Sequence, residues 1–378
     1  MKILIYTEYF PFTLDCDFRG GVEARTYFAA KELAKENQVT VIAAREKGQT
    51  QTDIPGIKVL RAGPERSFTQ GGELFKRYRF IRDAVKMGME VDCQVVEGTN
   101  FLTYRAAMKL AKKKKIPAVC TYHDVWIGQW RDNLGLLPGA IGEYAERKIL
   151  KYPWNKIIAV STITRSKLIQ QNVAERAISV VPNGFDFKKT PQSEKKFDDP
   201  TIIYVGRLVK YKRVGDIINA LAELKKTIAK VNLIIIGTGP ERNYLENKIR
   251  KLGLQDCVKF RGFVERYQEV LSLISRSQVL CLPSTVEGFG LVTIEAMAVS
   301  TPYVSSEIPP TVEVTQNGIG GILYPPGNIS ELTDALQSVL TDKNYAQQLG
   351  EAGRQFVEQK YNCHKIGEQL RQVYRDIR

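Results

Sequence analysis

Short apolar runs rich in β-branched residues alternate with helix-like segments along the chain, and this alternation restricts the fold more than any other feature. The first half contains the runs KILIYT, QVTVIAA, CQVVEG, PAVCTY and KIIAVS, separated by segments such as VEARTYFAAKELAKE. Strands that alternate with helices predict a parallel sheet connected by crossover helices.

The pattern restarts in the second half. A polar, proline-bounded stretch at 188–200 is followed by the runs TIIYVGR, VNLIIIGTG, VKFRG and SQVLCLPS. At 378 residues the chain is also longer than most single cores support. The predicted class is therefore α/β, with two Rossmann-like domains at 1–187 and 201–359 that face each other across a cleft, joined by a linker at 188–200.

Composition indicates a cytoplasmic protein with a basic N-terminal half. No window approaches the roughly 20 apolar residues that span a bilayer. The six cysteines lie far apart without a Cys-x-x-Cys pair, as is typical of reduced thiols. Residues 1–190 carry 31 Lys and Arg against 20 Asp and Glu, within a net charge of +14. This half either meets an anionic partner, phospholipid headgroups or nucleic acid, or presents a solvated basic surface.

Glycines and polar residues follow several predicted strands. They include Gly20-Gly21, His123-Asp124, Gly206-Arg207 and the stretch Gly237-Thr-Gly-Pro240. Ligands of open α/β sheets bind outside the carboxyl ends of the strands, so we expect these loops to line one cleft.

Two glutamates, Glu287 and Glu295, lie eight positions apart. On one helix they would be about 12 Å apart, too far for the roughly 5 to 10 Å of a glycoside hydrolase pair. Because Gly288 and Gly290 interrupt the start, we expect Glu287 on a loop and a helix at 291–298. The free N–H groups of its first turn suit a phosphate, while Glu295 suits ribose hydroxyls and Glu287 sugar hydroxyls.

A diphosphate also needs cations, and Arg207 and Lys212 follow a predicted strand. Arginine supplies a fork of donors and lysine a point charge, which together neutralise phosphate oxygens without a metal. The alternative for this pair alone is a solvated loop.

These motifs together resemble the retaining glycosyltransferases of the GT-B fold, family 4 type, over nearly the whole chain. The resemblance is carried by Gly20-Gly21, His123-Asp124, Val-Pro-Asn-Gly184, Gly206-Arg207 with Lys212, Gly237-Thr-Gly-Pro240, the stretch around Glu287, and Glu295. It also implies that the C-terminal helix, from about residue 360 to 378, crosses back to the N-terminal domain.

The resemblance implies a role for each matching residue. The catalytic set comprises Arg207, Lys212, Glu287 and His123, with His123 reaching the transferred sugar. The donor-binding set comprises Gly20, Gly21, Gly206, Gly239, Phe263, Gly288, Phe289, Gly290, Leu291, Val292 and Glu295.

The implied reaction is metal-independent transfer of a hexose, with retention, from a UDP- or GDP-linked sugar to an acceptor hydroxyl. The product would be a glycan, polysaccharide or glycolipid. The departing phosphate oxygen would take the acceptor proton, so His123 suits positioning better than general-base catalysis. No cofactor is expected.

Four alternatives compete with this interpretation. A GT-B-like nucleotide-sugar epimerase or hydrolase would share the cleft, and an anionic lipid or nucleic-acid binder would use the charge alone, although no nucleic-acid motif is present. Asp15-Cys16-Asp17 spells the Asp-x-Asp of metal-dependent glycosyltransferases, but two such acids are common in loops. A dehydrogenase is disfavoured because no Gly-x-Gly-x-x-Gly follows the first strand.

Basic residues gather in the segments 72–87 and 111–115. They indicate either solvated helix ends or docking of the N-terminal domain to the inner face of the cell membrane. The residues assigned to this acceptor or membrane side are Arg77, Arg79, Trp126, Trp130 and Arg131.

Overall fold

The computed structural model describes residues 1–12, 18, 20–51, 53–66, 73–187, 190–191 and 194–377. The chain forms two compact units, which are described separately. Unit 1 comprises Met1–Gly184 and Cys363–Arg378, and unit 2 comprises Phe185–Asn362. The boundary at Gly184 precedes the polar stretch at 188–200 that the composition marks as a linker.

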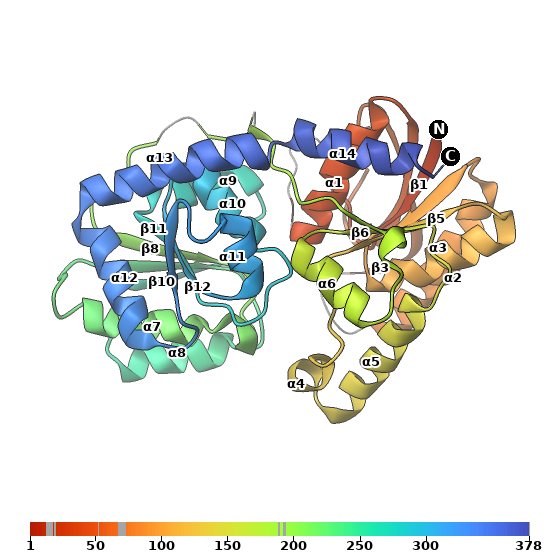
Figure 1. The fold of residues 1–378 in the computed structure, drawn as a ribbon. Helices are drawn as coiled ribbons and strands as arrows, with labels where there is room; N and C mark the ends of the chain where they lie inside the picture. Colours follow the sequence, from red (N-terminus) through yellow and green to blue (C-terminus); the bar gives the residue numbers. More distant parts are fainter. Residues whose placement is uncertain are drawn as a thin grey trace. The chain divides into compact units, whose positions relative to one another are not determined.

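Unit 1 is built on a seven-stranded parallel sheet with the order β3-β2-β1-β4-β5-β6-β7. Its strands are β1 (Lys2–Tyr6), β2 (Gln38–Glu46), β3 (Ile57–Arg66), β4 (Val95–Gly98), β5 (Ala118–Tyr122), β6 (Lys156–Ala159) and β7 (Ile178–Val180). The helices are α1 (Gly21–Ala34), α2 (Leu74–Glu90), α3 (Phe101–Lys114), α4 (Trp130–Leu134), α5 (Leu136–Leu150), α6 (Thr162–Gln170) and α14 (Cys363–Arg375), with a 3-10 turn at Glu175–Ala177. The helix α14 packs against α1 (Figure 1).

Unit 2 repeats the plan with a six-stranded parallel sheet in the order β10-β9-β8-β11-β12-β13. Its strands are β8 (Thr201–Val205), β9 (Asn232–Ile236), β10 (Val258–Gly262), β11 (Val279–Leu282), β12 (Tyr303–Ser306) and β13 (Gly321–Tyr324). The helices are α7 (Val214–Leu224), α8 (Arg242–Lys251), α9 (Tyr267–Arg276), α10 (Leu291–Ala298), α11 (Pro309–Thr315), α12 (Ile329–Thr341) and α13 (Lys343–Lys360), with a 3-10 turn at Lys210–Lys212 (Figure 1).

Both sheets have the strand order of a doubly wound nucleotide-binding fold, 3-2-1-4-5 counted within each unit. Each unit has its own core of buried aliphatic and aromatic side chains against its sheet. The predicted α/β class with two Rossmann-like domains is therefore confirmed.

The nine strands predicted from apolar runs are all present, whereas β3, β7, β12 and β13 were missed. The strand β3 contains Gly63 and Pro64, which are depleted in strands, and alternates only weakly in burial. The other three have only three or four residues each. Pairing with a neighbouring strand, which the local sequence does not encode, stabilises these short segments.

None of the described helices is long and apolar enough to cross a membrane.

Candidate functional site

Two glycine loops of unit 2 touch at the carboxyl edge of its sheet. A Cβ atom on Gly237 would lie 1.9 Å from the carbonyl oxygen of Gly206, and one on Gly239 would lie 2.2 Å from that of Leu208. Only glycine permits this approach, which brings the chain after β9 against the chain after β8. The arrangement leaves Arg207 exposed at the end of β8, where its guanidinium bonds the hydroxyl of Tyr211.

Lys212 and Glu287 form an ion pair that joins the 3-10 turn after β8 to the loop before α10. Their side chains are only 14% and 10% exposed, respectively. A second contact ties the same two segments, since the Thr285 amide donates to the Tyr211 carbonyl at 2.9 Å. The expected loop position of Glu287 is confirmed. Its carboxylate lies beside the Lys212 ammonium group, which a ligand phosphate would also attract.

The helix α10 begins at Leu291, as the sequence predicts, and its N-cap residue is Gly290 in the left-handed region, with φ 78°. No side chain caps this end, and the Thr293 amide donates to the Gly290 carbonyl at 2.9 Å. The N–H groups of Leu291 and Val292 are therefore the first-turn donors that suit an anion. The hydroxyls of Ser284 and Thr293 are buried without a hydrogen-bond partner among the described residues. Gly288 and Phe289 lead into the helix, with Phe289 buried against Tyr361. Val292 is the second residue of its first turn.

Glu295 lies inside the first turns of α10 and is 7% exposed. The Tyr267 hydroxyl donates to its Oε1 at 2.9 Å. Burial raises the pKa of Glu295 to about 7, against the opposing effect of the Tyr267 hydrogen bond. Near neutral pH this side chain is therefore partly a neutral carboxylic acid. Phe263, in the loop after β10, remains 40% exposed.

In unit 1, His123 follows β5 and its Nε2 lies 3.0 Å from the carbonyl oxygen of Thr99. A carbonyl oxygen only accepts, so Nε2 carries the proton and Nδ1 is the acceptor atom of the ring. Burial, and then the positive charge of Arg25, lower the pKa of His123 to about 4. The ring is therefore neutral and a weak base at neutral pH, which favours the positioning role.

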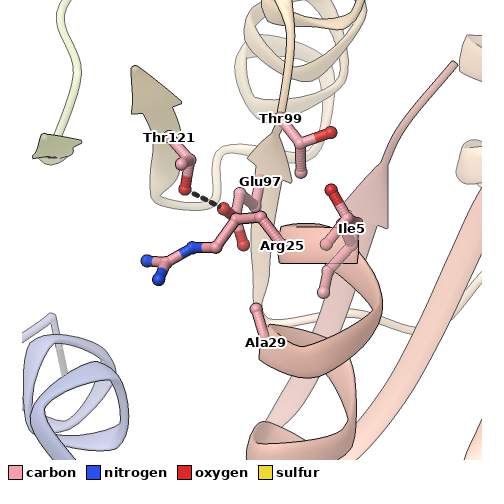
Figure 2. A pocket seen from close by; sticks show the side chains of 7 residues that line it. Ile5, Arg25, Ala29, Glu97, Thr99 and Thr121 are labelled. Carbon is pink, nitrogen blue, oxygen red and sulfur yellow. Dashed lines mark hydrogen bonds between the residues drawn. The ribbon is translucent and has the colours of Figure 1, made fainter. Parts of the chain in front are cut away.

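A small pocket beside His123 is lined by residues of α1, β4 and the ends of β1 and β5 (Figure 2). Glu97 lies buried in it and accepts hydrogen bonds from Thr121, at 2.5 Å, and from Tyr374 of α14. Desolvation raises the pKa of Glu97. Arg25 directs its guanidinium to the carbonyls of Val181, at 3.0 Å, and Pro182. Gly20 and Gly21 begin α1, the helix that carries Arg25.

The predicted acceptor-side residues fall in two places. The backbone amide of Trp126 and the indole N–H of Trp130 both donate to the buried Glu146, at 3.1 and 2.5 Å. Arg131 is exposed on α4. On α2, Arg79 is exposed, whereas Arg77 pairs with Glu8 at 3.2 Å and its side chain is 16% exposed. The pairing and burial of Arg77 oppose its predicted place on an exposed basic surface.

Asp15, Cys16 and Asp17 lie outside the described residues. Among the residues that are described, Glu32, Cys363 and His364 form one group of three potential ligands. Lys35 and Arg371 already pair with Glu32, at 2.7 and 3.0 Å, which opposes binding of a cation there.

Two glycosyltransferase families match the chain. Residues 19–189 match Glycosyltransferase Family 4, and residues 186–356 match Glycosyl transferases group 1. The chain is a glycosyltransferase. Its two parallel sheets correspond to the Rossmann-like domains of the GT-B fold.

Relatives of this glycosyltransferase span its whole length. It is 28% identical over 401 residues to glycogen synthase of Mycobacterium tuberculosis, covering 99% of this chain and 94% of that protein. Sucrose-phosphate synthase from Thermosynechococcus elongatus has a TM-score of 0.83 at 21% identity, covering 100% of this chain and 98% of its own. The Anabaena protein HepE, solved with UDP-glucose, has a TM-score of 0.77 at 19% identity, with both chains fully covered.

Within unit 2 of the glycosyltransferase, the structure brings the predicted donor residues to the carboxyl edge of one sheet. His123, Gly20 and Gly21 belong to unit 1. The sequence did not predict Tyr211 and Tyr267, which bond Arg207 and Glu295. It also did not predict the buried residues Arg25 and Glu97 of the unit 1 pocket. The sequence contains no signal for Arg25, because α1 also contains the charged residues Glu23, Lys31 and Glu32.

Proposed function

We propose that this glycosyltransferase transfers a hexose, with retention and without a metal, from a UDP- or GDP-linked sugar to an acceptor hydroxyl. The observation that carries the proposal is the Lys212–Glu287 ion pair beside the uncapped N-terminus of α10. Arg207, exposed at the end of β8 in the same unit, adds a second cation. A diphosphate and the sugar attached to it require this combination of positive charge, free N–H groups and a carboxylate.

The donor would lie along the carboxyl edge of the unit 2 sheet. Its diphosphate binds the first-turn amides of α10 together with Arg207 and Lys212, and its ribose hydroxyls donate to Glu295. The exposed ring of Phe263 suits a contact with the base. The donor competes with Glu287 for Lys212, so Glu287 is released from its ion pair to accept hydrogen bonds from sugar hydroxyls.

The reaction breaks the bond between the anomeric carbon and the diphosphate oxygen, and the acceptor oxygen forms a bond to that carbon on the same face. The acceptor proton passes to the departing phosphate oxygen, so no protein base is needed. Negative charge increases on the diphosphate in the transition state, where Arg207, Lys212 and the helix N-terminus stabilise it most. Neutral His123 accepts a hydrogen bond at Nδ1 from the sugar and orients it.

The known relatives indicate which donor to try first. HepE was solved with UDP-glucose, and glycogen synthase and sucrose-phosphate synthase are both named for products that contain glucose. We therefore take UDP-glucose as the first probe. The acceptor class remains a glycan, a polysaccharide or a glycolipid.

The test of retention and metal independence uses water as a slow acceptor, because this needs no knowledge of the natural one. The protein is incubated with UDP-α-glucose, and the first sugar released is observed by NMR before mutarotation. We expect α-glucose, at a rate that EDTA does not change. Initial release of β-glucose would refute retention, and activity lost with EDTA and restored by manganese would refute metal independence.

The site assignment is tested with Lys212→Ala and Glu287→Ala. Each is expected to abolish glucose release while circular dichroism and the unfolding profile stay those of a folded protein. Lys210→Ala is the matched control, since Lys210 is exposed on the same 3-10 turn. Near-normal turnover in either site variant would overturn the assignment.

A further inference from the structure

Unit 2 contains a second pocket, separate from the residues assigned to the donor. It has a volume of about 320 Å³ and is lined by the residue after β12, the loop after α11, the edge strand β13 and the start of α13. Ligand pockets in proteins typically have volumes of about 300–1,000 Å³. Because none of the predicted donor residues lines it, the pocket is a distinct candidate for a ligand.

Three side chains supply the polar groups of this pocket, namely Glu307, Asn317 and Tyr345. All three are exposed, Tyr345 by 37%. Within the part of the chain that the structure describes, none of these three side chains forms a hydrogen bond or an ion pair. The carboxylate, the amide and the phenol hydroxyl are therefore available to a ligand.

The backbone beside the pocket adopts an uncommon conformation. Gln316 and Asn317 are adjacent non-glycine residues with positive φ, 51° and 65°. The Asn317 N–H donates to the Val312 carbonyl at 2.9 Å, which stabilises the turn. Left-handed non-glycine residues cost free energy and gather at ligand sites. This turn places the Asn317 side chain at the pocket, and a ligand there gives a reason for its conformation.

The charges of the lining exclude several kinds of ligand. Among the described residues that line the pocket, Glu307 is the one charged side chain. A phosphate or carboxylate ligand would need cations, and calcium would need about six or more oxygen ligands. A peptide strand would need a longer edge, because β13 has four residues and the next residue, Pro325, lacks an N–H group. These exclusions leave a neutral polar ligand.

We propose that this pocket binds a hexose unit of a neutral glycan. A pyranose ring has a flat face of C–H bonds, which suits the exposed ring of Tyr345. Its hydroxyls donate to the Glu307 carboxylate and exchange hydrogen bonds with the Asn317 amide. Ile322 and Leu323, which are partly buried on β13, add apolar surface to the lining.

A glycan bound here is attached to the enzyme at a point that takes no part in the transfer. When one chain binds at two sites of the same protein, the first contact raises its effective concentration at the second. The pocket therefore favours long acceptors over short ones. This preference rests on the proposed function, whereas binding of the glycan itself goes beyond it and requires neither the donor nor the reaction.

Binding is tested by native affinity electrophoresis of the full chain in gels that contain glycogen, dextran or mannan, which are neutral polysaccharides. We expect at least one of the three to retard the wild type, at low and at high salt. Tyr345→Ala is expected to raise the dissociation constant for that polysaccharide at least about fivefold. Tyr345→Phe keeps the ring and should lose less.

Two further variants define the polar contact and the control. Glu307→Gln should weaken binding less than Glu307→Ala, because the amide oxygen still accepts hydrogen bonds. The matched control is Tyr244→Ala, which removes an exposed tyrosine from α8 of the same unit and should bind like the wild type. A thermal shift with UDP that is unchanged in Tyr345→Ala shows that this variant is folded.

Three results would overturn the proposal. They are the absence of retardation by all three polysaccharides, equal retardation of Tyr345→Ala and the wild type, and retardation that high salt abolishes. The last result would indicate a charge contact elsewhere on this basic chain. The gels contain no donor, so failure of the proposed transfer reaction would leave the binding result standing.

Discussion

The titration of Glu295 provides the sharpest test of the donor site. Burial raises its pKa from the ordinary value of 4.5 for a glutamate to about 7. The folded protein therefore holds this proton more tightly than the unfolded chain does between these two values. By linkage, the free energy of unfolding falls as pH rises from about 4.5 to about 7, and stays level with respect to this group above that range.

The magnitude follows from the size of the shift. A difference of about 2.5 pKa units corresponds to about 3 kcal/mol, at about 1.4 kcal/mol per unit. Glu295→Gln keeps the shape and still accepts from Tyr267 but has no titration. We expect urea unfolding of the variant, compared with the wild type, to show a relative gain of about 3 kcal/mol between pH 4.5 and pH 8.

The control for this experiment is Glu265→Gln, an exposed glutamate of the same unit, whose pH profile should parallel the wild type. If the profile of Glu295→Gln also parallels the wild type, Glu295 is not desolvated as described. The same proton gives a second readout. A carboxylate accepts ribose hydroxyls more strongly than a neutral carboxyl does. Binding of UDP-glucose, whose phosphates do not titrate near pH 6, should therefore release nearly one proton at pH 6, measurable by calorimetry in buffers of different ionisation enthalpy.

Two further predictions concern the loops and the pocket of unit 1. Gly239→Ala places a Cβ atom 2.2 Å from the Leu208 carbonyl, so we expect a loss of about 1–3 kcal/mol in unfolding free energy and weaker UDP binding by calorimetry. Gly215→Ala, inside α7 and with its nearest neighbour at 3.7 Å, should not lower the unfolding free energy and should leave UDP binding unchanged. Arg25→Met should raise the pKa of His123 above about 4, because the Arg25 charge contributes to lowering it. The chain has only two histidines, so a His364→Asn variant assigns the ring signals in an NMR titration, and an unchanged pKa would refute this electrostatic link.

The parts of the fold predicted from sequence are those whose cause is local. Buried parallel strands read as continuous apolar runs, which is why KILIY of β1 and NLIII of β9 were recognised. The short strand β13 begins with Gly321, whose Cβ position lies 2.3 Å from the Tyr303 carbonyl. Its glycine is required by the neighbouring strand, a tertiary constraint that weakens the local signal.

In the candidate site, too, the features with a local cause were predictable and those that depend on tertiary contacts were not. The break before α10 was predictable, because Gly290 adopts a left-handed conformation that favours glycine. The hydrogen-bond partners of the site residues were not predictable, because Tyr267 contacts Glu295 from 28 positions away in the sequence.

The two glutamates of the donor site are alike in sequence, but their surroundings differ in the way that a nucleotide sugar requires. Glu287 forms an ion pair with Lys212, and this pair must open when a phosphate binds the lysine. Glu295 accepts a hydrogen bond from a tyrosine hydroxyl, whereas Glu287 is paired with a cation. Burial therefore keeps Glu295 protonated until the ribose hydroxyls bind. Binding of one ligand would therefore change both groups, by exchange of an ion pair at Glu287 and by release of a proton at Glu295. A ligand carrying the diphosphate without the ribose should produce the first change alone, so inorganic pyrophosphate should bind without releasing a proton from Glu295.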